Sequence, residues 1–215
     1  PGAGMSTARP SPLRGARPTK ADLERFAGRP GPAADDLLPE TGEPIRLLIV
    51  GINPGLWTAA VNAPFARPGN RFWPSLAAAG ITEREVDASR GLSDEDEAMI
   101  LGLGIGMTNL VPRATARADE LTNEEQCDGA ARLARLAASR HPAAVAVVGV
   151  TAFRTAFRRP KASLGRQDTE SLEAGGEEWP GGSALWVLPN PSGLNAHETV
   201  DSLADRWREV WRTLD

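Results

Sequence analysis

The stretch that decides the fold is IRLLIVGINPGL, residues 45–56. Its first part, Ile45–Val50, is apolar except for Arg46, which is typical of a strand buried inside a sheet. Gly51 ends the strand, and the Asn-Pro-Gly that follows at residues 53–55 is typical of a tight turn. The pattern predicts a strand that delivers a stiff loop to one edge of a sheet.

Strand-like and helix-like segments alternate along the rest of the chain. The valine-rich segment Ala143–Val150 is apolar throughout, like strands that are covered on both faces in parallel sheets. Further strands are predicted at Gly106–Val111 and Ala184–Leu188, and helices at residues 70–79, 93–101, 122–140, 151–157 and 199–214. This alternation predicts an α/β fold, a three-layer α/β/α sandwich around a mostly parallel sheet.

The N-terminal quarter of the chain has a different composition. Pro1–Gly4 precede Met5 and have the appearance of a vector remnant, and residues 5–18 are rich in Pro, Arg, Ser and Gly, which predicts a disordered basic tail. A short helix is predicted to begin after Thr19, and the prolines of residues 30–44 predict an extended linker. The chain is therefore expected to divide into residues 1–18, residues 19–44 and one folded domain over residues 45–215.

Composition narrows the class of protein. The 215 residues are 41% hydrophobic and 24% charged, which suits one globular domain, and we expect a monomer. No apolar run approaches the roughly 20 residues that span a bilayer, and no secretory signal is recognisable, so we expect a cytoplasmic protein with no membrane partner. Cys127 is the single cysteine, and His141 and His197 are the only histidines. We therefore expect chemistry that uses no metal and no cofactor.

The charge distribution permits a nucleic-acid partner without demonstrating one. The formal net charge of −4 argues weakly against it. Residues 1–30, however, hold six basic and two acidic side chains, a local charge of 6 − 2 = +4, and Arg154–Arg166 holds five basic side chains and no acidic one. Phosphate contacts need only a local basic surface, although two solvated faces explain the same pattern.

Three loops are predicted to follow the carboxyl ends of strands, where parallel sheets bind their ligands, at residues 51–71, 108–117 and 190–197. In the first, the Asn53 amide can accept from water through its oxygen, although the same turn can be merely structural. Phe65 either stacks on a flat base or covers the core. Leu194, on the third loop, either wedges into a base stack or packs as a staple on the last helix.

Four motifs occur in order along the chain: GINPGL at residues 51–56, PGNRFW at 68–73, GMTNLV at 106–111 and NPSGL at 190–194. Together they resemble the mismatch-specific uracil–DNA glycosylase (Mug) and thymine–DNA glycosylase family of the uracil–DNA glycosylase superfamily. The resemblance extends from Ile45 to the C-terminus. It implies a DNA-repair enzyme that flips uracil, or a related mispaired pyrimidine, out of double-stranded DNA and hydrolyses its N-glycosidic bond.

The resemblance also implies roles for residues of the base pocket. Asn53 matches the catalytic asparagine that orients the attacking water. Phe65 matches the aromatic residue that stacks on the flipped base, and the backbone around Ile52 and Phe65 would bind the edge of that base. Asn109 matches a polar residue lining the pyrimidine pocket, and Asn190 stands where other branches of the superfamily carry a histidine.

On the third loop, Gly193, Leu194 and Asn195 match the wedge that replaces the extruded nucleotide and contacts the opposite guanine. Two positions depart from the family's pattern. Trp57 follows Gly-Leu where a small residue is expected, and Ala63-Pro64 stands where relatives have bulkier side chains. These departures leave open which bases the pocket accepts.

An amide has no useful proton affinity at neutral pH, so Asn53 cannot act as a general base and we expect a slow enzyme that works by positioning. A separate carboxylate, Asp94 or Asp96, is a candidate assistant; the alternative is that both complete the start of a helix. The competing interpretation of the whole chain is a catalytically inactive mismatch- or DNA-binding protein on the same fold. A nucleotide-binding regulator and a serine hydrolase are disfavoured, because neither a glycine-rich phosphate loop nor a G-x-S-x-G motif is present.

Overall fold

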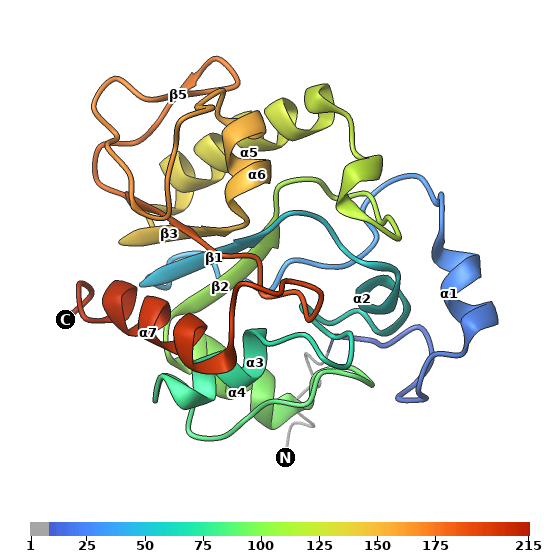
Figure 1. Cartoon of the computed structure of the whole chain (residues 1–215). Helices are drawn as coiled ribbons and strands as arrows, with labels where there is room; N and C mark the ends of the chain where they lie inside the picture. The colour runs from blue at the N-terminus through green and yellow to red at the C-terminus, as the bar shows by residue number, and fades with distance from the viewer. Residues whose placement is uncertain (1–8) are drawn as a thin grey trace.

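The structure is a computed structural model that describes residues 9–215; Pro1–Gly4, interpreted above as a vector remnant, and the first part of the predicted tail lie outside the described residues. Its centre is a five-stranded sheet with the order β2-β1-β3-β7-β4 (Figure 1). Four strands are parallel, and the fifth, a two-residue edge strand, is antiparallel to β7. The strands are Leu47–Gly51 (β1), Ile105–Asn109 (β2), Ala144–Val148 (β3), Gly165–Arg166 (β4) and Ala184–Leu188 (β7), and Glu173–Ala174 (β5) pairs with Glu177–Glu178 (β6) in a small separate sheet.

Helices cover both faces of the sheet, so the predicted three-layer α/β/α class is confirmed (Figure 1). Successive side chains of a strand point to opposite faces. Accordingly, Leu47 and Ile49 of β1 pack into one core with α3 (Phe72–Ala78), α4 (Asp94–Gly102) and α7 (Val200–Trp211). Leu48 and Val50 pack into the other core with α5 (Asn123–Arg140) and α6 (Val150–Ala156). All of β1 is buried, which explains its uninterrupted apolar sequence.

Capping residues set the helix starts that the sequence predicted. Thr122 and Thr199 cap α5 and α7, and each forms a reciprocal capping box with the third residue of its helix. The helix predicted over residues 70–79 begins later, at Phe72, and Arg71 occupies the cap position. Asn70 Oδ1 accepts from the Phe72 amide at 2.9 Å, from one position earlier than the cap. The six-residue helix α2 (Leu56–Val61) was not predicted, because Gly55 gives it no side-chain cap.

The segment before Ile45 packs on the domain. Residues 30–44 contain no helix, as their prolines predicted, but Leu37 is buried and exchanges backbone hydrogen bonds with Met107 of β2. Helix α1 (Lys20–Phe26) packs on α2, and Phe26 joins Ala59 and Ala60 in a small core of their own. The expected disorder does not extend to residues 9–18, where Pro18 is buried. The division of the chain at residues 18 and 44 remains a prediction.

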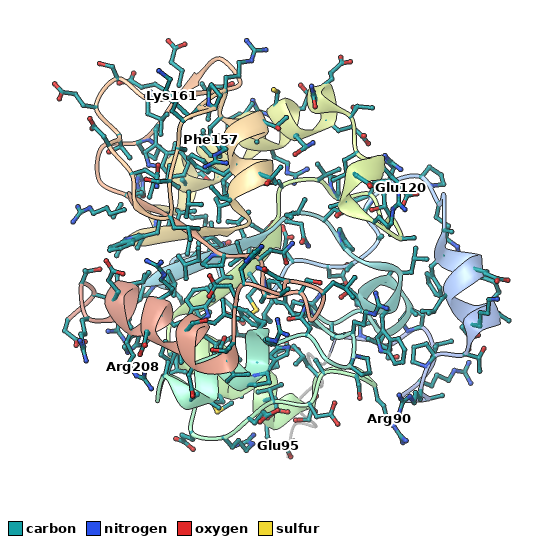
Figure 2. All side chains as sticks on the ribbon, viewed as in Figure 1. Arg90, Glu95, Glu120, Phe157, Lys161 and Arg208 are labelled. Carbon is teal, nitrogen blue, oxygen red and sulfur yellow. The ribbon has the colours of Figure 1, made fainter. Side chains whose placement is uncertain are left out.

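Charged side chains lie at the periphery. Lys161 and Glu95 are exposed, and Glu95 lies at the lower edge of the molecule in Figure 2, whereas Phe157 is buried. The five basic side chains of residues 154–166 are all exposed. Among residues 9–215, no helix is long and apolar enough to cross a membrane.

The topology creates a crevice at the carboxyl ends of the strands. After β1 the chain turns towards α2, α3 and α4 on one face, whereas after the neighbouring strand β3 it enters α6 on the other face. Loops that leave adjacent parallel strands in opposite directions leave a gap between them, and ligands of open α/β sheets bind there.

Candidate active site

A cavity of about 380 Å³ opens at this edge of the sheet. Its volume is near the lower end of the roughly 300–1,000 Å³ of ligand pockets. The five side chains predicted for the base pocket all line it, which brings together three segments far apart in the sequence: Ile52, Asn53, Phe65, Asn109 and Asn190. The cavity therefore has room for one small ring system.

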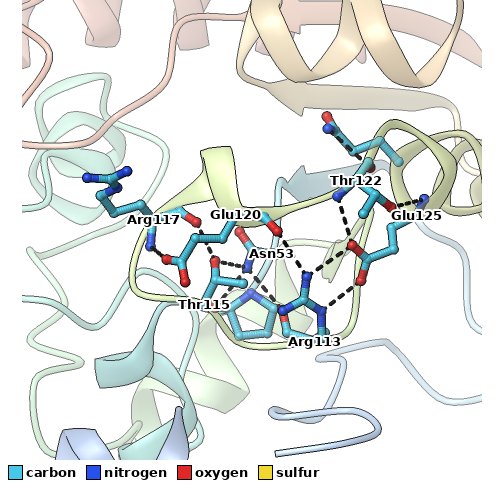
Figure 3. A network of polar contacts seen from close by, with 9 residues as sticks. Asn53, Arg113, Thr115, Arg117, Glu120, Thr122 and Glu125 are labelled. Atoms are coloured by element: carbon cyan, nitrogen blue, oxygen red, sulfur yellow. Dashed lines mark hydrogen bonds and ion pairs between the residues drawn. The ribbon is translucent and has the colours of Figure 1, made fainter. Parts of the chain in front are cut away.

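The Asn53 amide is held in one orientation by its surroundings (Figure 3). Its Nδ2 donates to the Thr115 hydroxyl at 2.8 Å and to the Arg113 carbonyl at 3.0 Å. The Thr115 hydroxyl donates its one proton to the Arg117 carbonyl at 2.7 Å. It can therefore only accept in its hydrogen bond with Asn53. A third acceptor, the Pro54 carbonyl, lies 3.3 Å from the same nitrogen. The protein thus fixes the amide nitrogen, and Oδ1 is the atom left for the cavity.

The loop that orients Asn53 is anchored to the start of α5. The Arg113 guanidinium donates to both carboxylate oxygens of Glu125, with distances of 2.7 and 3.0 Å (Figure 3). Glu125 also accepts from the Thr122 backbone amide at 2.8 Å as part of the capping box. The hydrogen bonds from Arg113, and then the one from Thr122, lower the pKa of Glu125 to about 2.

This anchor predicts an acid-sensitive contribution to stability. Because the folded-state pKa of Glu125 lies below the ordinary value of 4.5, its contribution is present above pH 4.5 and is lost as the pH falls towards 2. We expect the Glu125→Gln variant to lack this part of the pH dependence. Urea unfolding at pH 6, 4 and 3 measures it, with Glu124→Gln, an exposed neighbour, as the control. Parallel losses in wild type and Glu125→Gln would contradict the assignment.

Phe65 forms one wall of the cavity and is fixed from behind. Its ring stacks on the buried ring of Phe72, with centroids 3.9 Å apart, and its backbone adopts φ = 52°, which is unusual for an aromatic residue. Because Gly51 has no side chain, Asn109 and Phe65 can both lie close to its backbone. A Cβ at this position would lie 2.5 Å from Asn109 Oδ1 and 3.6 Å from Phe65 Cζ. The ring therefore both covers core, as one alternative held, and borders the cavity, as the other required.

The loop that follows β7 leaves the cavity wall at Asn190 and carries an exposed leucine at its tip. Leu194 is 84% exposed and is the one large hydrophobic side chain so exposed among residues 9–215. The interpretation of Leu194 as a staple on the last helix is therefore wrong. Asn190 Oδ1 accepts from the Ser192 amide, and Asn195 Nδ2 donates to the Asn190 carbonyl, each at 3.0 Å. These bonds stiffen the loop from within.

The loop before α3, which contains Gly69 and Arg71, contacts the loop of Leu194 from outside. The Arg71 guanidinium donates to three of its carbonyl oxygens, those of Ser192, Gly193 and Asn195. A Cβ on Gly193 would lie 2.6 Å from the Gly69 carbonyl oxygen, so the two backbones touch. Gly193, Leu194 and Asn195 do not line the cavity themselves, but the loop that carries them begins in its wall.

A stiff polar turn, an aromatic wall and a rigid apolar loop tip thus meet at one edge of the sheet. The family model of the uracil DNA glycosylase superfamily matches residues 39–215, most of the chain. The chain belongs to the uracil DNA glycosylase superfamily. It is accordingly a DNA glycosylase, a hydrolase of base excision repair that acts on DNA.

The structure gives no support to the carboxylates proposed to assist this glycosylase. Asp94 and Asp96 belong to α4 and do not line the cavity, and Asp96 forms an ion pair with Arg84 at 2.6 Å. Their acidic run suits the positive end of the helix, which was the alternative interpretation. Of the described residues that line the cavity, only Asp35 is acidic, and its Oδ2 accepts from Asn62 at 2.9 Å.

Thr115, Arg113 and Arg71 are residues of the glycosylase site that sequence reasoning missed. Thr115 and Arg113 lie in a loop that was singled out as a strand exit, which was the one signal available for them. Arg71 lies inside the motif PGNRFW, but nothing in its spacing indicates that it contacts the loop of Leu194. No group of three or more His, Cys, Asp or Glu side chains in the described part of the chain is placed to hold a metal ion.

Proposed function

We propose that this glycosylase removes uracil, and related mispaired pyrimidines, from double-stranded DNA in the manner of the mismatch-specific branch of its superfamily. The observation that carries the proposal is the orientation of Asn53, whose amide oxygen is free for the cavity while three protein acceptors hold its nitrogen. An acceptor fixed beside a flipped nucleotide can hold a water molecule with a lone pair directed at the sugar carbon.

In the proposed reaction the bond between C1′ and the pyrimidine nitrogen breaks, and its electron pair leaves with the base. The water held by Asn53 adds to C1′ and then loses a proton to solvent, since an amide cannot take it. Asn190 uses Oδ1 to accept from Ser192, which leaves its Nδ2 to donate towards the leaving pyrimidine. A preorganised donor of this kind stabilises negative charge as it develops on the base.

The rim of the cavity supports a duplex substrate. Exposing Leu194 to water gains nothing for folding, whereas an apolar tip inserted between bases fills the space of an extruded nucleotide. Extrusion costs a few kcal/mol and least at a mismatch, so a mispaired uracil is favoured before any contact with the base is made.

The direct test uses duplexes with one G·U, A·U or G·T pair, treated with the protein and then with alkali to cleave abasic sites. We expect strand breaks at uracil, and faster release from G·U than from A·U because the mispair opens at lower cost. Duplex binding without any strand break would refute the enzymatic proposal and favour the inactive DNA-binding protein.

Thr115 is a positioning residue in this scheme, and removing its hydroxyl tests the orientation of Asn53. Thr115→Val keeps the shape of a buried side chain but leaves Nδ2 with one fewer acceptor. We expect uracil release to slow by about tenfold, the equivalent of one hydrogen bond of roughly 1.4 kcal/mol. The loss should appear in kcat and leave KM unchanged.

Single-turnover rates and duplex affinity, measured together, separate positioning from folding. Thr115→Ser keeps the hydroxyl and is expected to restore most of the rate, although it removes the same methyl group that a packing role would need. A wild-type rate in Thr115→Val together with a slow Thr115→Ser would show that the methyl group, not the hydroxyl, is what matters.

A further inference from the structure

One face of α5 contacts the end of β2 and the loop that follows it, through residues 125, 129 and 132. Spacings of four and three residues place these positions on the same side of a helix. Glu125 binds Arg113 of the loop, as described above. Gly129 lets the helix approach, because a Cβ there would lie 2.3 Å from the Leu110 carbonyl oxygen. Arg132 makes the third contact, with the residues where the strand ends.

Arg132 holds the backbone that carries Asn109. Its Nη2 donates to the Asn109 carbonyl and to the Leu110 carbonyl, each at 2.6 Å. β2 is an edge strand, and its bridge to Leu37 uses Met107, two residues before this point. The arginine thus supplies a donor where the sheet has an edge rather than another strand.

The same backbone is bound on its other side to the loop after β1. The Leu110 amide donates to the Gly51 carbonyl at 2.8 Å, and the Val111 amide donates to the Ile52 carbonyl at 2.9 Å. Because α5 and this loop hold the backbone from two sides, the Cα–Cβ bond of Asn109 has one direction. The Asn109 side chain therefore meets the cavity in one place.

The Asn109 amide is available to a ligand. It lines the cavity, and none of the hydrogen bonds within residues 9–215 uses its nitrogen or its side-chain oxygen. The amides of Asn53 and Asn190, by contrast, are partly engaged by the protein. An amide offers both donors and an acceptor, which complement the carbonyl and N–H groups along the edge of a pyrimidine. Asn109 can therefore bind a base as long as its backbone stays in place.

Arg132 gives up hydration to make its contacts with the two carbonyls. It is half-buried, and desolvation, together with the charge of Arg135, lowers its pKa, whereas the carboxylate of Asp36 raises it. A guanidinium that loses water costs free energy unless its donors find acceptors in the protein. The two carbonyl oxygens at the end of β2 are such acceptors, and they explain why this side chain turns towards the sheet.

We propose that Arg132 is a positioning residue of the base pocket, which fixes the backbone of Asn109 so that the Asn109 amide meets the edge of the flipped pyrimidine. This inference rests on the proposed function and deepens it, because it names a residue behind the cavity on which recognition of the base depends. Arg132 does not line the cavity itself. Its loss should therefore weaken the binding of the base and leave the contacts of the Leu194 loop with the duplex unchanged.

The contribution of the base is measured with two duplexes that cannot be cleaved. One carries 2′-fluoroarabino-uridine opposite guanine, and the other carries a tetrahydrofuran abasic analogue at the same position. The ratio of the two affinities reports on the base, because the contacts with the rest of the duplex are common to both. A general loss of DNA binding lowers both affinities and leaves their ratio unchanged.

The variants separate the contact from the helix that carries it. Arg132→Met keeps an apolar stem and removes the donors, and Arg132→Gln is too short to reach both carbonyls. Arg132→Lys keeps one charged nitrogen, which can replace Nη2 because that single atom makes both bonds. Arg135→Met is the matched control, since Arg135 is an exposed arginine of the same helix and pairs with Glu177.

We expect the affinity ratio, uridine analogue to abasic analogue, to fall about tenfold in Asn109→Ala, as for the loss of a hydrogen bond to the base. It should fall severalfold in Arg132→Met and Arg132→Gln. The Arg132→Lys and Arg135→Met proteins should stay within about twofold of wild type, the spread of changes that do not interact.

A double-mutant cycle shows whether Arg132 acts through Asn109. Adding Arg132→Met to Asn109→Ala should change the ratio by less than about twofold, because the side chain that Arg132 positions is already absent. Equal losses with and without the Asn109 side chain would overturn the inference. So would wild-type ratios in Arg132→Met and Arg132→Gln proteins that thermal unfolding shows to be folded.

Failure of the proposed function gives a different result. A wild type that binds the uridine analogue more tightly than the abasic duplex but releases no uracil would refute the catalytic proposal, and the ratios of the variants would still test Arg132. A wild-type ratio in Asn109→Ala would overturn the role of Arg132, since it would have no side chain to act through, and would leave the release of uracil unaffected.

Discussion

Replacing Asn53 with alanine is expected to lower the rate of uracil release by about 100- to 1,000-fold, the range seen when one preorganised polar group of an active site is removed. The variant loses the acceptor that holds the water, while the other walls of the cavity keep their contacts. Duplex affinity should therefore stay close to that of wild type. Single-turnover release from a G·U duplex, measured beside a binding titration, checks both expectations.

Asn123→Ala is the matched control for this variant. Asn123 is an exposed asparagine in the first turn of α5, outside the cavity that Asn53 lines. Its replacement should leave release unchanged. An Asn53→Ala variant that releases uracil at the wild-type rate would remove Asn53 from the mechanism, and the orientation of its amide would then have no catalytic meaning.

Aspartate at the same position is not expected to improve the enzyme at neutral pH. The atom that replaces Nδ2 would be an oxygen facing the Arg113 carbonyl, which is itself an acceptor. Thr115 could donate to this oxygen only by giving up its bond to the Arg117 carbonyl. A carboxyl group in this setting is stabilised in its protonated form. The activity of the Asn53→Asp variant should therefore rise with pH more steeply than that of wild type.

The parts of the fold that the sequence predicted best are those that depend on local pattern. The strands β1, β3 and β7 were found from apolar runs, because strands covered by helices on both faces have no polar positions. The short strands β4, β5 and β6 were not predicted; they lie within residues 160–182, which are polar and rich in glycine. Their pairing depends on neighbours that are distant in sequence or on a turn, and two residues carry no periodicity.

In the candidate site, too, local sequence predicted some residues, whereas contacts between distant segments could not be predicted. Asn53 was identified by its motif and Phe65 by the family resemblance, but the orientation of Asn53 depends on Thr115, more than 60 residues later. Residues 9–18 were predicted to be disordered because they are rich in prolines and arginines. Arg9 instead binds Asn62, which ends α2 in a left-handed conformation with φ = 55°. Composition cannot reveal such a partner, because the partner exists only once α2 and the segment of Asp35 before β1 are in place.

Replacing Gly193 with alanine is expected to lower uracil release from duplexes by about 100-fold, the cost of a displacement on the order of 1 Å near a catalytic site. The new Cβ would lie 2.6 Å from the Gly69 carbonyl oxygen, so one backbone must move away from the other. The movement carries Leu194 with it and strains the hydrogen bonds from Arg71. Release from a G·U duplex, measured beside thermal unfolding, checks this.

Gly182→Ala is the matched control, since a Cβ at Gly182 meets nothing within 4 Å and its backbone does not require glycine. Leu194→Ala is the complementary variant, because it removes the exposed tip without moving the loop. If the loop acts only through this tip, Gly193→Ala and Leu194→Ala should lower the rate of uracil release by the same factor. We expect the larger loss for Gly193→Ala, because the displaced loop begins at Asn190 in the cavity wall and would disturb the base as well as the duplex.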